Sequence, residues 1–310
     1  MPLLPIPPRG DDWHALRARH VGASEISILF GCAPDYLPGV YALWHVKAGL
    51  IPREEVANQR AAWGLLLEEA IAAGAAEREG WQVLPGRYAS RDGLGATLDR
   101  IIAEPGPNDE GCTGPGVLEL KNVDWMVHRR GWDGEPPLHI LLQLQAQLAA
   151  TAFTWGAVAA LVGGNDLKVW RYSARPKLHA EIMARVTHFW RSIREGKPPQ
   201  PDGSDATYRA LMVLEPEVVD EPADLSADNE APDLAARYLA AAAAEKAAKA
   251  EKEEARNRLL EKLGSCRWGD TTGYRISQAV TPAKDQRPAR PGEIISGRAE
   301  ARRIIVKELT

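Results

Sequence analysis

The sequence predicts an α/β protein in which helices flank a central mixed sheet over residues 1–200. Apolar side chains recur at helical spacing in several stretches, at residues 22–30, 63–78, 139–148 and 178–195. Two strand hairpins are predicted among these stretches. The first joins residues 96–102 to 116–122 through a connection rich in Gly, Pro, Asn and Asp, and the second joins 156–161 to 167–172 through a Gly-Gly-Asn-Asp turn. Helices that alternate with hairpins in this way pack on the faces of a shared sheet.

The chain changes character after this predicted domain. Residues 201–232 are acidic and rich in Pro and Asp, which predicts a linker. Residues 233–310 predict a helical and β extension. It contains one long helix at 233–263, which would run roughly 45 Å, and extended pieces at 274–280 and 304–309. The apolar stripe of the long helix is thin, so we expect this helix to pack on another surface, from its own chain or from a partner subunit.

Composition excludes several classes of protein. With 45% hydrophobic and 26% charged residues the chain is an ordinary globular one, and its net charge of −4 means that any nucleic-acid site must be a local basic groove. The cysteines lie far apart and without CxxC spacing, at Cys32, Cys112 and Cys266, which argues against a disulfide framework, a zinc ribbon or an iron–sulphur cluster. Because no apolar run reaches about 18 residues and no signal-peptide core is present, we expect a cytoplasmic protein without a membrane span.

The strand predicted at 116–122 carries the tripeptide Glu119-Leu120-Lys121. Because side chains alternate along a strand, Glu119 and Lys121 point to one face while the leucines beside them point into a core. A carboxylate and an ammonium placed in this way can hold a divalent metal and the water that it activates. An ordinary edge strand with a solvated Glu and Lys has the same pattern, so the tripeptide by itself does not distinguish a metal site from such a strand. The first hairpin would bring Asp99 close to this face.

Polar residues on two predicted helices have both an ordinary and a functional interpretation. Glu68 lies among leucines on the helix at 63–78, where it is either a carboxylate at the helix rim or a functional group. On the helix that follows the first hairpin, Gln143 and Gln147 share one side and Gln145 lies roughly opposite, at about 100° per residue. These glutamines either form a polar stripe that faces solvent or need hydrogen-bond partners inside the protein.

Taken in order, Glu68, Asp99, Glu119 and Lys121 form the pattern carboxylate, carboxylate, Glu-x-Lys, which resembles the PD-(D/E)xK nuclease superfamily. A longer series of motifs runs through residues 13–200: Trp13-x-x-Leu16-Arg17, Gly22-Ala23-Ser24-Glu25, Tyr41-x-Leu43-Trp44-x-x-Lys47-x-Gly49, Trp63-Gly64-x-x-x-Glu68, Ala96-Thr97-Leu98-Asp99, Leu118-Glu119-Leu120-Lys121, Gln143-x-Gln145 and Phe189-Trp190. This series resembles more closely the lambda exonuclease and YqaJ-like viral recombinase family. Each motif is weak alone, but their joint occurrence in this order is specific.

Two residues depart from the pattern of the family. Arg100 follows Asp99 at a position where relatives commonly have Gly, and Glu69 follows Glu68 where many relatives have Pro. Neither departure removes a catalytic group.

The resemblance implies a restriction-endonuclease-like core and Mg²⁺-dependent hydrolysis of DNA phosphodiesters, with Mn²⁺ able to substitute. Asp99, Glu119 and the backbone carbonyl of Leu120 would bind the metal, because Mg²⁺ prefers hard oxygen ligands and keeps several waters. Glu68 would complete the site, directly or through a water on a second ion.

The resemblance also gives roles to residues around the attacking water and the DNA end. Lys121 would orient the water that the metal activates, and Gln143 would hydrogen-bond that water or Lys121. Arg17 and Ser24 match the positions that bind a terminal 5′-phosphate in the lambda-type enzymes, and Gln145 is a secondary candidate in DNA binding. From the residues alone, Ser24 is also a plausible N-cap of the helix that follows it, and a helix N-terminus itself favours anions.

These matches imply a 5′→3′ exonuclease that digests one strand of linear double-stranded DNA and leaves a 3′ single-stranded tail. The implied partners are DNA ends, a single-strand annealing protein and further copies of the chain, for which a trimeric ring is one arrangement. An endonuclease or repair nuclease on the same site, without strict dependence on a 5′ end, is an alternative. A catalytically silent DNA-binding or assembly protein, and a scaffold built on the long helix, are others. The presence of Glu68, Asp99, Glu119 and Lys121 favours catalysis.

Overall fold

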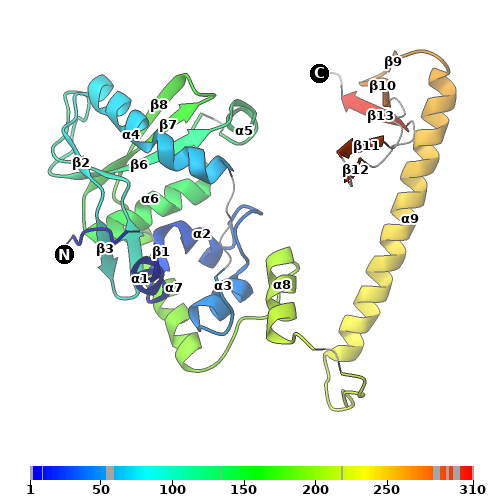
Figure 1. Ribbon diagram of the computed structural model, residues 1–310, viewed down its shortest axis with the longest axis horizontal. Helices are drawn as coiled ribbons and strands as arrows, with labels where there is room; N and C mark the ends of the chain where they lie inside the picture. Colours follow the sequence, from blue (N-terminus) through cyan, green and yellow to red (C-terminus); the bar gives the residue numbers. More distant parts are fainter. Residues whose placement is uncertain are drawn as a thin grey trace. The chain divides into compact units, whose positions relative to one another are not determined.

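The computed structural model describes most of the chain, which forms two compact units at residues 1–218 and 219–310 (Figure 1). The described residues are 3–8, 10–53, 59–132, 134–217, 219–281, 287–290, 293–295 and 301–308. The first unit contains every residue of the predicted carboxylate and lysine pattern.

The centre of the first unit is a five-stranded mixed sheet with the strand order β2-β5-β6-β7-β8. Its strands are β2 (Val83–Pro85), β5 (Arg100–Ile102), β6 (Gly116–Val123), β7 (Trp155–Val162) and β8 (Asp166–Ser173). β6 and β7 run parallel, with Glu119 opposite Val158, and the other neighbouring strands are antiparallel. Parallel neighbours need a crossover, which here contains α5 (Trp125–Gly131) and α6 (Leu138–Thr151). The mixed sheet confirms the predicted fold class.

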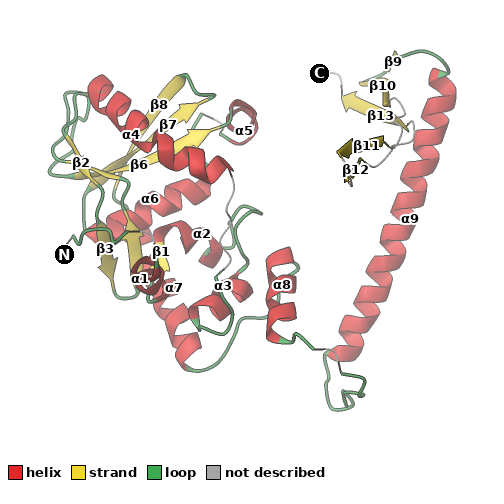
Figure 2. Ribbon diagram, in the orientation of Figure 1, coloured by secondary structure: helices red, strands yellow, loops and turns green. Residues whose placement is uncertain are grey.

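Helices cover both faces of this sheet (Figure 2). α4 (Gln59–Glu79) packs on one face, where Leu118 and Leu120 belong to a buried cluster with apolar residues of α4. α6 packs on the other face, in a second buried cluster that includes Val117. Because side chains alternate along β6, Glu119 points to the face that α6 covers. β6 is therefore a central strand, and the interpretation as a solvated edge strand is wrong.

The strand predicted at 96–102 is two strands in different sheets. β5 belongs to the main sheet, whereas β4 belongs to a small sheet with the order β1-β4-β3. The strands of the small sheet are β1 (Val21–Gly22), β3 (Tyr88–Arg91) and β4 (Leu94–Thr97). The chain crosses between the sheets at Leu98 and Asp99, so Asp99 lies directly before β5 and not inside a strand. The segment contains no Gly or Pro that would predict a break, and its two halves become separate strands because they pair with different neighbours.

The remaining helices of the first unit are α1 (Asp11–Ala18), the 3₁₀ helix η1 (Ala23–Glu25), α2 (Ile26–Leu29), α3 (Val40–Lys47), α7 (Pro176–Arg194) and α8 (Asp205–Leu214). α8 lies inside the predicted linker at 201–232 and corrects that prediction. Ser204 caps it by accepting a hydrogen bond from the Thr207 N–H at 3.2 Å. Ala210 of α8 is buried in a cluster with Tyr41 of α3. Packing on α3 stabilises α8. The sequence did not predict this helix because the acidic residues around it suggested a linker.

The second unit contains the long helix α9 (Ala231–Leu263) and a three-stranded sheet with the order β13-β10-β9. Its strands are β9 (Trp268–Thr271), β10 (Tyr274–Thr281) and β13 (Ala301–Glu308), beside a hairpin of β11 (Arg287–Arg290) and β12 (Glu293–Ile295). The predicted helix and both predicted extended pieces are confirmed, except that residue 309 lies outside the described residues. α9 has 33 residues and is about 50 Å long. Among the described helices, none has the length and apolar character that a bilayer span needs.

Gly86 allows a close approach to the segment that carries Asp99. A Cβ atom at Gly86 would lie 2.0 Å from the carbonyl oxygen of Leu98 and 2.6 Å from that of Asp99. Since backbone cannot give way as a flexible side chain does, Gly86→Ala must displace this segment. We expect it to lower the free energy of unfolding by about 1–3 kcal/mol, measured by chemical denaturation. Gly131→Ala, whose Cβ meets nothing within 4 Å, is the control, and an equal loss in both variants would contradict the prediction.

Candidate active site

Asp99 and Glu119 face each other across the pair of β5 and β6. The antiparallel register places Arg100 opposite Leu118, and one residue further along Asp99 meets Glu119. The backbone N–H of Leu120 donates a hydrogen bond to Asp99 Oδ2 at 2.8 Å. The hairpin therefore brings together the two carboxylates that the sequence predicted to meet.

Glu119 is the buried centre of this group, with 1% of its surface exposed. Gln143 Nε2 donates to Glu119 Oε1 at 2.6 Å and Gln147 Nε2 donates to Oε2 at 2.6 Å. The Lys121 ammonium also donates to Oε1. Gln147 Nε2 also donates to the Thr97 carbonyl oxygen at 3.2 Å, which connects α6 to β4. Both carboxylate oxygens are thus paired, as a buried charge requires.

Two carboxylates, Glu119 and Asp99, act on Lys121, and a third, Glu68, acts on Asp99. Burial and then the charge of Glu119 raise the pKa of Asp99 well above its usual range; Lys121 lowers it in part, and Glu68 raises it further. Burial alone would lower the pKa of Lys121, but Glu119 and Asp99 outweigh burial and hold it above its ordinary value. Lys121 is therefore a cation at neutral pH, and a further positive charge beside Asp99 would be stabilised.

The oxygen donors of this group fit a hard divalent cation. Asp99 and Glu119 supply carboxylates, and the Leu120 carbonyl lies between Glu119 and Lys121 on the same strand. Mg²⁺ is usually held by one or two carboxylates and keeps several waters. In the part of the chain that the structure describes, no three His, Cys, Asp or Glu side chains form a ready-made cage. This arrangement suits an ion that retains water and does not suit a structural zinc.

Glu68 reaches the same region from α4. It lines a cavity of about 280 Å³ together with Leu120 and Lys121. The charge of Glu68 acts on Asp99, whose pKa it raises. The half-buried carboxylate therefore borders the space beside the Leu120 backbone, which is where a role through a metal-bound water would place it.

The two departures from the family pattern contact each other. Arg100 Nη2 lies 2.6 Å from Glu69 Oε2, and Arg100 Nη1 donates to the carbonyl oxygen of Asp99 at 2.6 Å. The Arg100 guanidinium thus connects the backbone of Asp99, a predicted metal ligand, to Glu69 on α4. An exposed ion pair contributes little to stability, so we assign this contact to positioning of Asp99 relative to α4.

A second charged cluster surrounds Glu25. Its buried carboxylate lies 2.9 Å from Lys47, 3.1 Å from Arg53 and 3.6 Å from Arg17. Burial would raise the pKa of Glu25, but the three cations outweigh burial and lower it. Among the described residues, three cations thus lie around this one carboxylate, and a group of cations at a cavity attracts anions.

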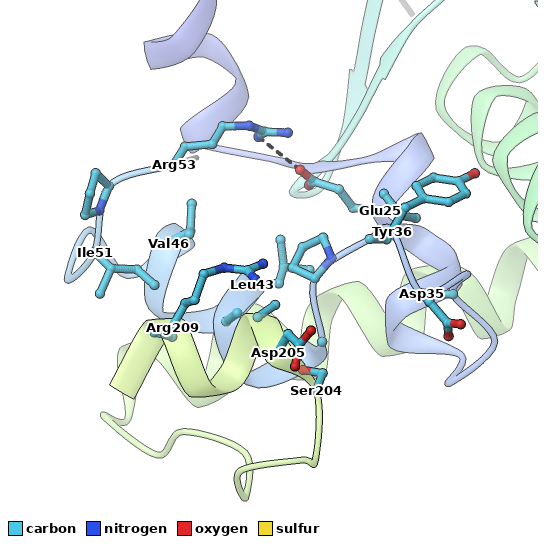
Figure 3. Close-up of a pocket in the computed structure, with 18 of the residues that line it drawn as sticks. Glu25, Asp35, Tyr36, Leu43, Val46, Ile51, Arg53, Ser204, Asp205 and Arg209 are labelled. Carbon is cyan, nitrogen blue, oxygen red and sulfur yellow. Dashed lines mark ion pairs between the residues drawn. The ribbon is translucent and has the colours of Figure 1, made fainter. Parts of the chain in front are cut away.

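This cation cluster borders a cavity of about 1710 Å³ (Figure 3). Arg17 and Arg53 line it, and Arg209 lines it from α8. Leu65 lines both this cavity and the smaller one beside Lys121. The cation cluster and the catalytic group therefore border adjacent spaces, although they come from different parts of the chain.

Ser24 does not cap a helix as predicted. It is exposed and lies inside η1, and the backbone N–H of Gly22 at the start of η1 is capped by Glu25 Oε2 at 2.8 Å. The acidic side chain three residues along reaches back to the N–H of the N-cap residue, which is Gly22 and not Ser24. Arg17 lines the large cavity, whereas Ser24 is not among its lining residues.

Gln145 points away from the catalytic group and Gln147 takes part in it. Gln145 Nε2 donates to the Ser173 carbonyl at 2.9 Å, and its Oε1 accepts from the Arg175 N–H at 3.0 Å. This side chain is buried between α6 and the chain that follows β8. The sequence contained the signal for Gln147, because residues four apart share a helix face with Gln143, but the family motif drew attention to Gln145.

A helix-flanked mixed sheet with facing carboxylates and a Glu-x-Lys strand is the arrangement that the resemblance to PD-(D/E)xK nucleases predicted. Residues 12–154 match the YqaJ-like viral recombinase domain. A relative in Bacillus subtilis (strain 168), named "Uncharacterized protein YqaJ", is 28% identical over 228 residues, which cover 71% of this chain and 68% of the relative.

Solved structures with similar folds come from several bacteria. An alkaline exonuclease, LHK-Exo, from Laribacter hongkongensis is 18% identical, with 67% of this chain and 100% of that chain covered and a TM-score of 0.47. A phage-related exonuclease from Haemophilus somnus 129PT is 10% identical, with 59% of this chain and 98% of that chain covered and a TM-score of 0.39.

The raised pKa of Asp99 predicts a pH-dependent cost in stability. A carboxyl group whose pKa is higher in the folded than in the unfolded state adds stability when it is protonated, and this stability is lost as pH rises through the folded value. Asp99→Asn removes the cost and keeps an oxygen for the Leu120 N–H. In EDTA we expect Asp99→Asn to have a higher Tm than the wild type at neutral pH. The rise should be about 2–4 °C for each kcal/mol that the substitution adds to the free energy of unfolding. Acidification should remove the difference, and a lower Tm at neutral pH would contradict the assignment.

The contact between Arg100 and Glu69 predicts an effect on metal binding. We expect Arg100→Ala to weaken Mg²⁺ binding about 10-fold or more, as loss of a residue behind a ligand typically does, in isothermal titration calorimetry. Arg185 is a matched control because it also contacts a carboxylate and a backbone carbonyl, Glu181 and Leu29, each at 2.7 Å. Equal Mg²⁺ affinities in Arg100→Ala and Arg185→Ala would show that Arg100 does not position the ligand.

Proposed function

We propose that this chain is a metal-dependent deoxyribonuclease that digests one strand of linear double-stranded DNA in the 5′→3′ direction and leaves a 3′ single-stranded tail. The observation that carries the proposal is the adjacency of the catalytic group around Glu119 and the cation cluster around Glu25, which border cavities that share Leu65. An end-dependent exonuclease needs one site for the terminal phosphate and a second for the bond to be cut. The YqaJ-like viral recombinase domain at residues 12–154 supports this class of activity.

Asp99, Glu119 and the Leu120 carbonyl would hold Mg²⁺ or Mn²⁺, which lowers the pKa of a bound water and neutralises charge on the phosphate. Glu119 and Asp99 hold the pKa of Lys121 above its ordinary value, which favours the ammonium form. This ammonium would orient the attacking water and offset negative charge that develops on the phosphate. Gln143 contacts both partners, since it donates to Glu119 and its Oε1 accepts from Lys121 at 3.3 Å.

The reaction is a hydrolysis. A water oxygen forms a bond to phosphorus, the bond from phosphorus to the 3′ oxygen breaks, and the leaving oxygen takes up a proton. The released nucleotide then ends in a 3′-hydroxyl, and the shortened strand carries a new 5′-phosphate. This product is again a ligand for the cation cluster, so the same strand can be cut repeatedly.

Arg17 is the proposed contact for the 5′-phosphate. Its guanidinium lies beside Glu25 at 3.6 Å and over the Trp13 ring at 5.4 Å, so it is held at the cavity wall. A guanidinium binds phosphate strongly through charge-assisted hydrogen bonds. Ser24 is kept as a neighbouring candidate because it precedes Glu25, although it does not line the cavity.

The same proposal names the partners. A 3′ single-stranded tail is the substrate of a single-strand annealing protein, which we propose as the functional partner in the cytoplasm. We also propose that the chain acts as a homo-oligomer, with α9 as a contributor because most of this helix is exposed within its own unit.

The direct test is a linear duplex labelled on each strand in turn, incubated with Mg²⁺. Loss of the 5′-ended strand with retention of its complement is the expected result, and Glu119→Ala should reduce the rate by at least about 100-fold. Cutting of a nicked circle at a similar rate would favour an endonuclease on the same site. Full activity in Glu119→Ala would contradict the catalytic assignment.

Arg17 provides a test of direction. Because hydrogen bonds to charged groups contribute about 1.5–3 kcal/mol, we expect Arg17→Ala to slow digestion of 5′-phosphorylated ends about 10- to 150-fold. Digestion of 5′-hydroxyl ends should change little, and the affinity for Mg²⁺ should be unchanged. Equal slowing on both kinds of end would mean that Arg17 does not recognise the terminal phosphate.

A further inference from the structure

Tyr36 is an exposed aromatic residue that is held in place. It lies between α2 and α3, and 74% of its surface is exposed. Its hydroxyl is hydrogen-bonded to His139 Nε2 at 3.2 Å, and the two rings meet edge to face at 82° with centroids 6.3 Å apart. An exposed tyrosine gains little stability from such a contact, so the fixed ring calls for another explanation.

The partner of Tyr36 stands on the catalytic helix. His139 lies in the first turn of α6, four residues before Gln143 and eight before Gln147. Residues at this spacing share one helix face, and this is the face that holds Glu119. The hydrogen bond to His139 therefore connects the loop that carries Tyr36 to the catalytic group.

The charge of Lys121 acts on both rings. Burial lowers the pKa of His139, and the charge of Lys121 lowers it further. Partial burial raises the pKa of the Tyr36 hydroxyl, and the same lysine charge opposes that shift.

Tyr36 also lines the large cavity that Arg17 and Arg53 border (Figure 3). The ring therefore borders the cavity beside the cation cluster, and through His139 it contacts the helix that carries Gln143 and Gln147. A DNA strand that occupied this cavity would pass the ring. An aromatic face binds nucleobases by stacking, largely without regard to sequence, and each stacked base contributes about 1–3 kcal/mol.

We propose that Tyr36 stacks on a nucleobase of the strand that is cut, next to the cleaved bond, and that His139 is a positioning residue that fixes the ring. The ligand of this site is a nucleobase of unpaired or fraying DNA at the 5′ end. The inference rests on the proposed function, because it assumes that a DNA strand occupies the cavity. It adds a base-binding site to the phosphate and metal sites.

Base stacking can be tested with substrates that lack one base. The substrate is a 5′-phosphorylated duplex with an abasic residue at the first, second or third position, compared with the intact duplex. In the wild type we expect one abasic position to raise KM about 5- to 150-fold, which corresponds to the 1–3 kcal/mol of a stacked base. Tyr36→Ala should raise KM on the intact duplex by a similar factor, with kcat less affected, and should show no further loss on the abasic duplex.

Two other variants test the hydrogen bond between Tyr36 and His139. Tyr36→Phe keeps the ring but loses the hydroxyl that is hydrogen-bonded to His139, and His139→Ala removes the other partner, so both variants should give a KM between those of the wild type and Tyr36→Ala. Tyr208→Ala is the control, since Tyr208 is 64% exposed on α8 and is not among the residues that line the cavity. It should behave as the wild type.

A binding measurement does not depend on cleavage. A 2-aminopurine at the position identified above should be quenched when the duplex binds the wild type in EDTA, and much less when it binds Tyr36→Ala. An equal abasic penalty and equal quenching in the wild type and Tyr36→Ala would overturn the stacking site while leaving the nuclease proposal intact. A wild type that quenches but digests no duplex would instead overturn the proposed function and retain base binding.

Discussion

The first unit is arranged around one buried carboxylate. Glu119 lies on a central strand, and a buried charge costs several kcal/mol unless hydrogen bonds and counter-charges satisfy it. The amides of Gln143 and Gln147 and the ammonium of Lys121 do so here. These contacts require α6 to lie across β6 with one particular face toward the strand. The same amide groups restrict how the carboxylate can turn, so the constraint that stabilises burial also orients a metal ligand.

The position of Asp99 beside Glu119 lowers the stability of the folded protein. The carboxyl group is held next to Glu119 by the Leu120 N–H, and the pKa of Asp99 rises as a result. Keeping the two carboxylates together costs stability, through repulsion or through the proton uptake that the raised pKa of Asp99 favours, and a bound divalent cation would remove this cost. The contact of Arg100 with Glu69 and with the Asp99 carbonyl limits how far the backbone can move apart under that repulsion.

Several features followed from the sequence because they are local. Alternation along residues 116–122 predicted both the strand and the common face of Glu119 and Lys121, and the structure confirms the strand as β6. Other expectations failed where a distant contact decided the outcome. The segment at 96–102 divides between two sheets because its halves pair with different strands, and α8 forms where the composition predicted a linker because it packs on α3.

The sequence by itself determined the order of helices and strands and the presence of the carboxylates and lysine, because periodicity and motif spacing depend on neighbours along the chain. Helical spacing already placed Gln147 on the side of Gln143 and Gln145 opposite, but only the tertiary structure decided that this side meets Glu119. It also brought Tyr36 to His139, 103 residues away. Such pairings arise from the packing of whole elements, and no local pattern specifies which remote side chain will complete a site.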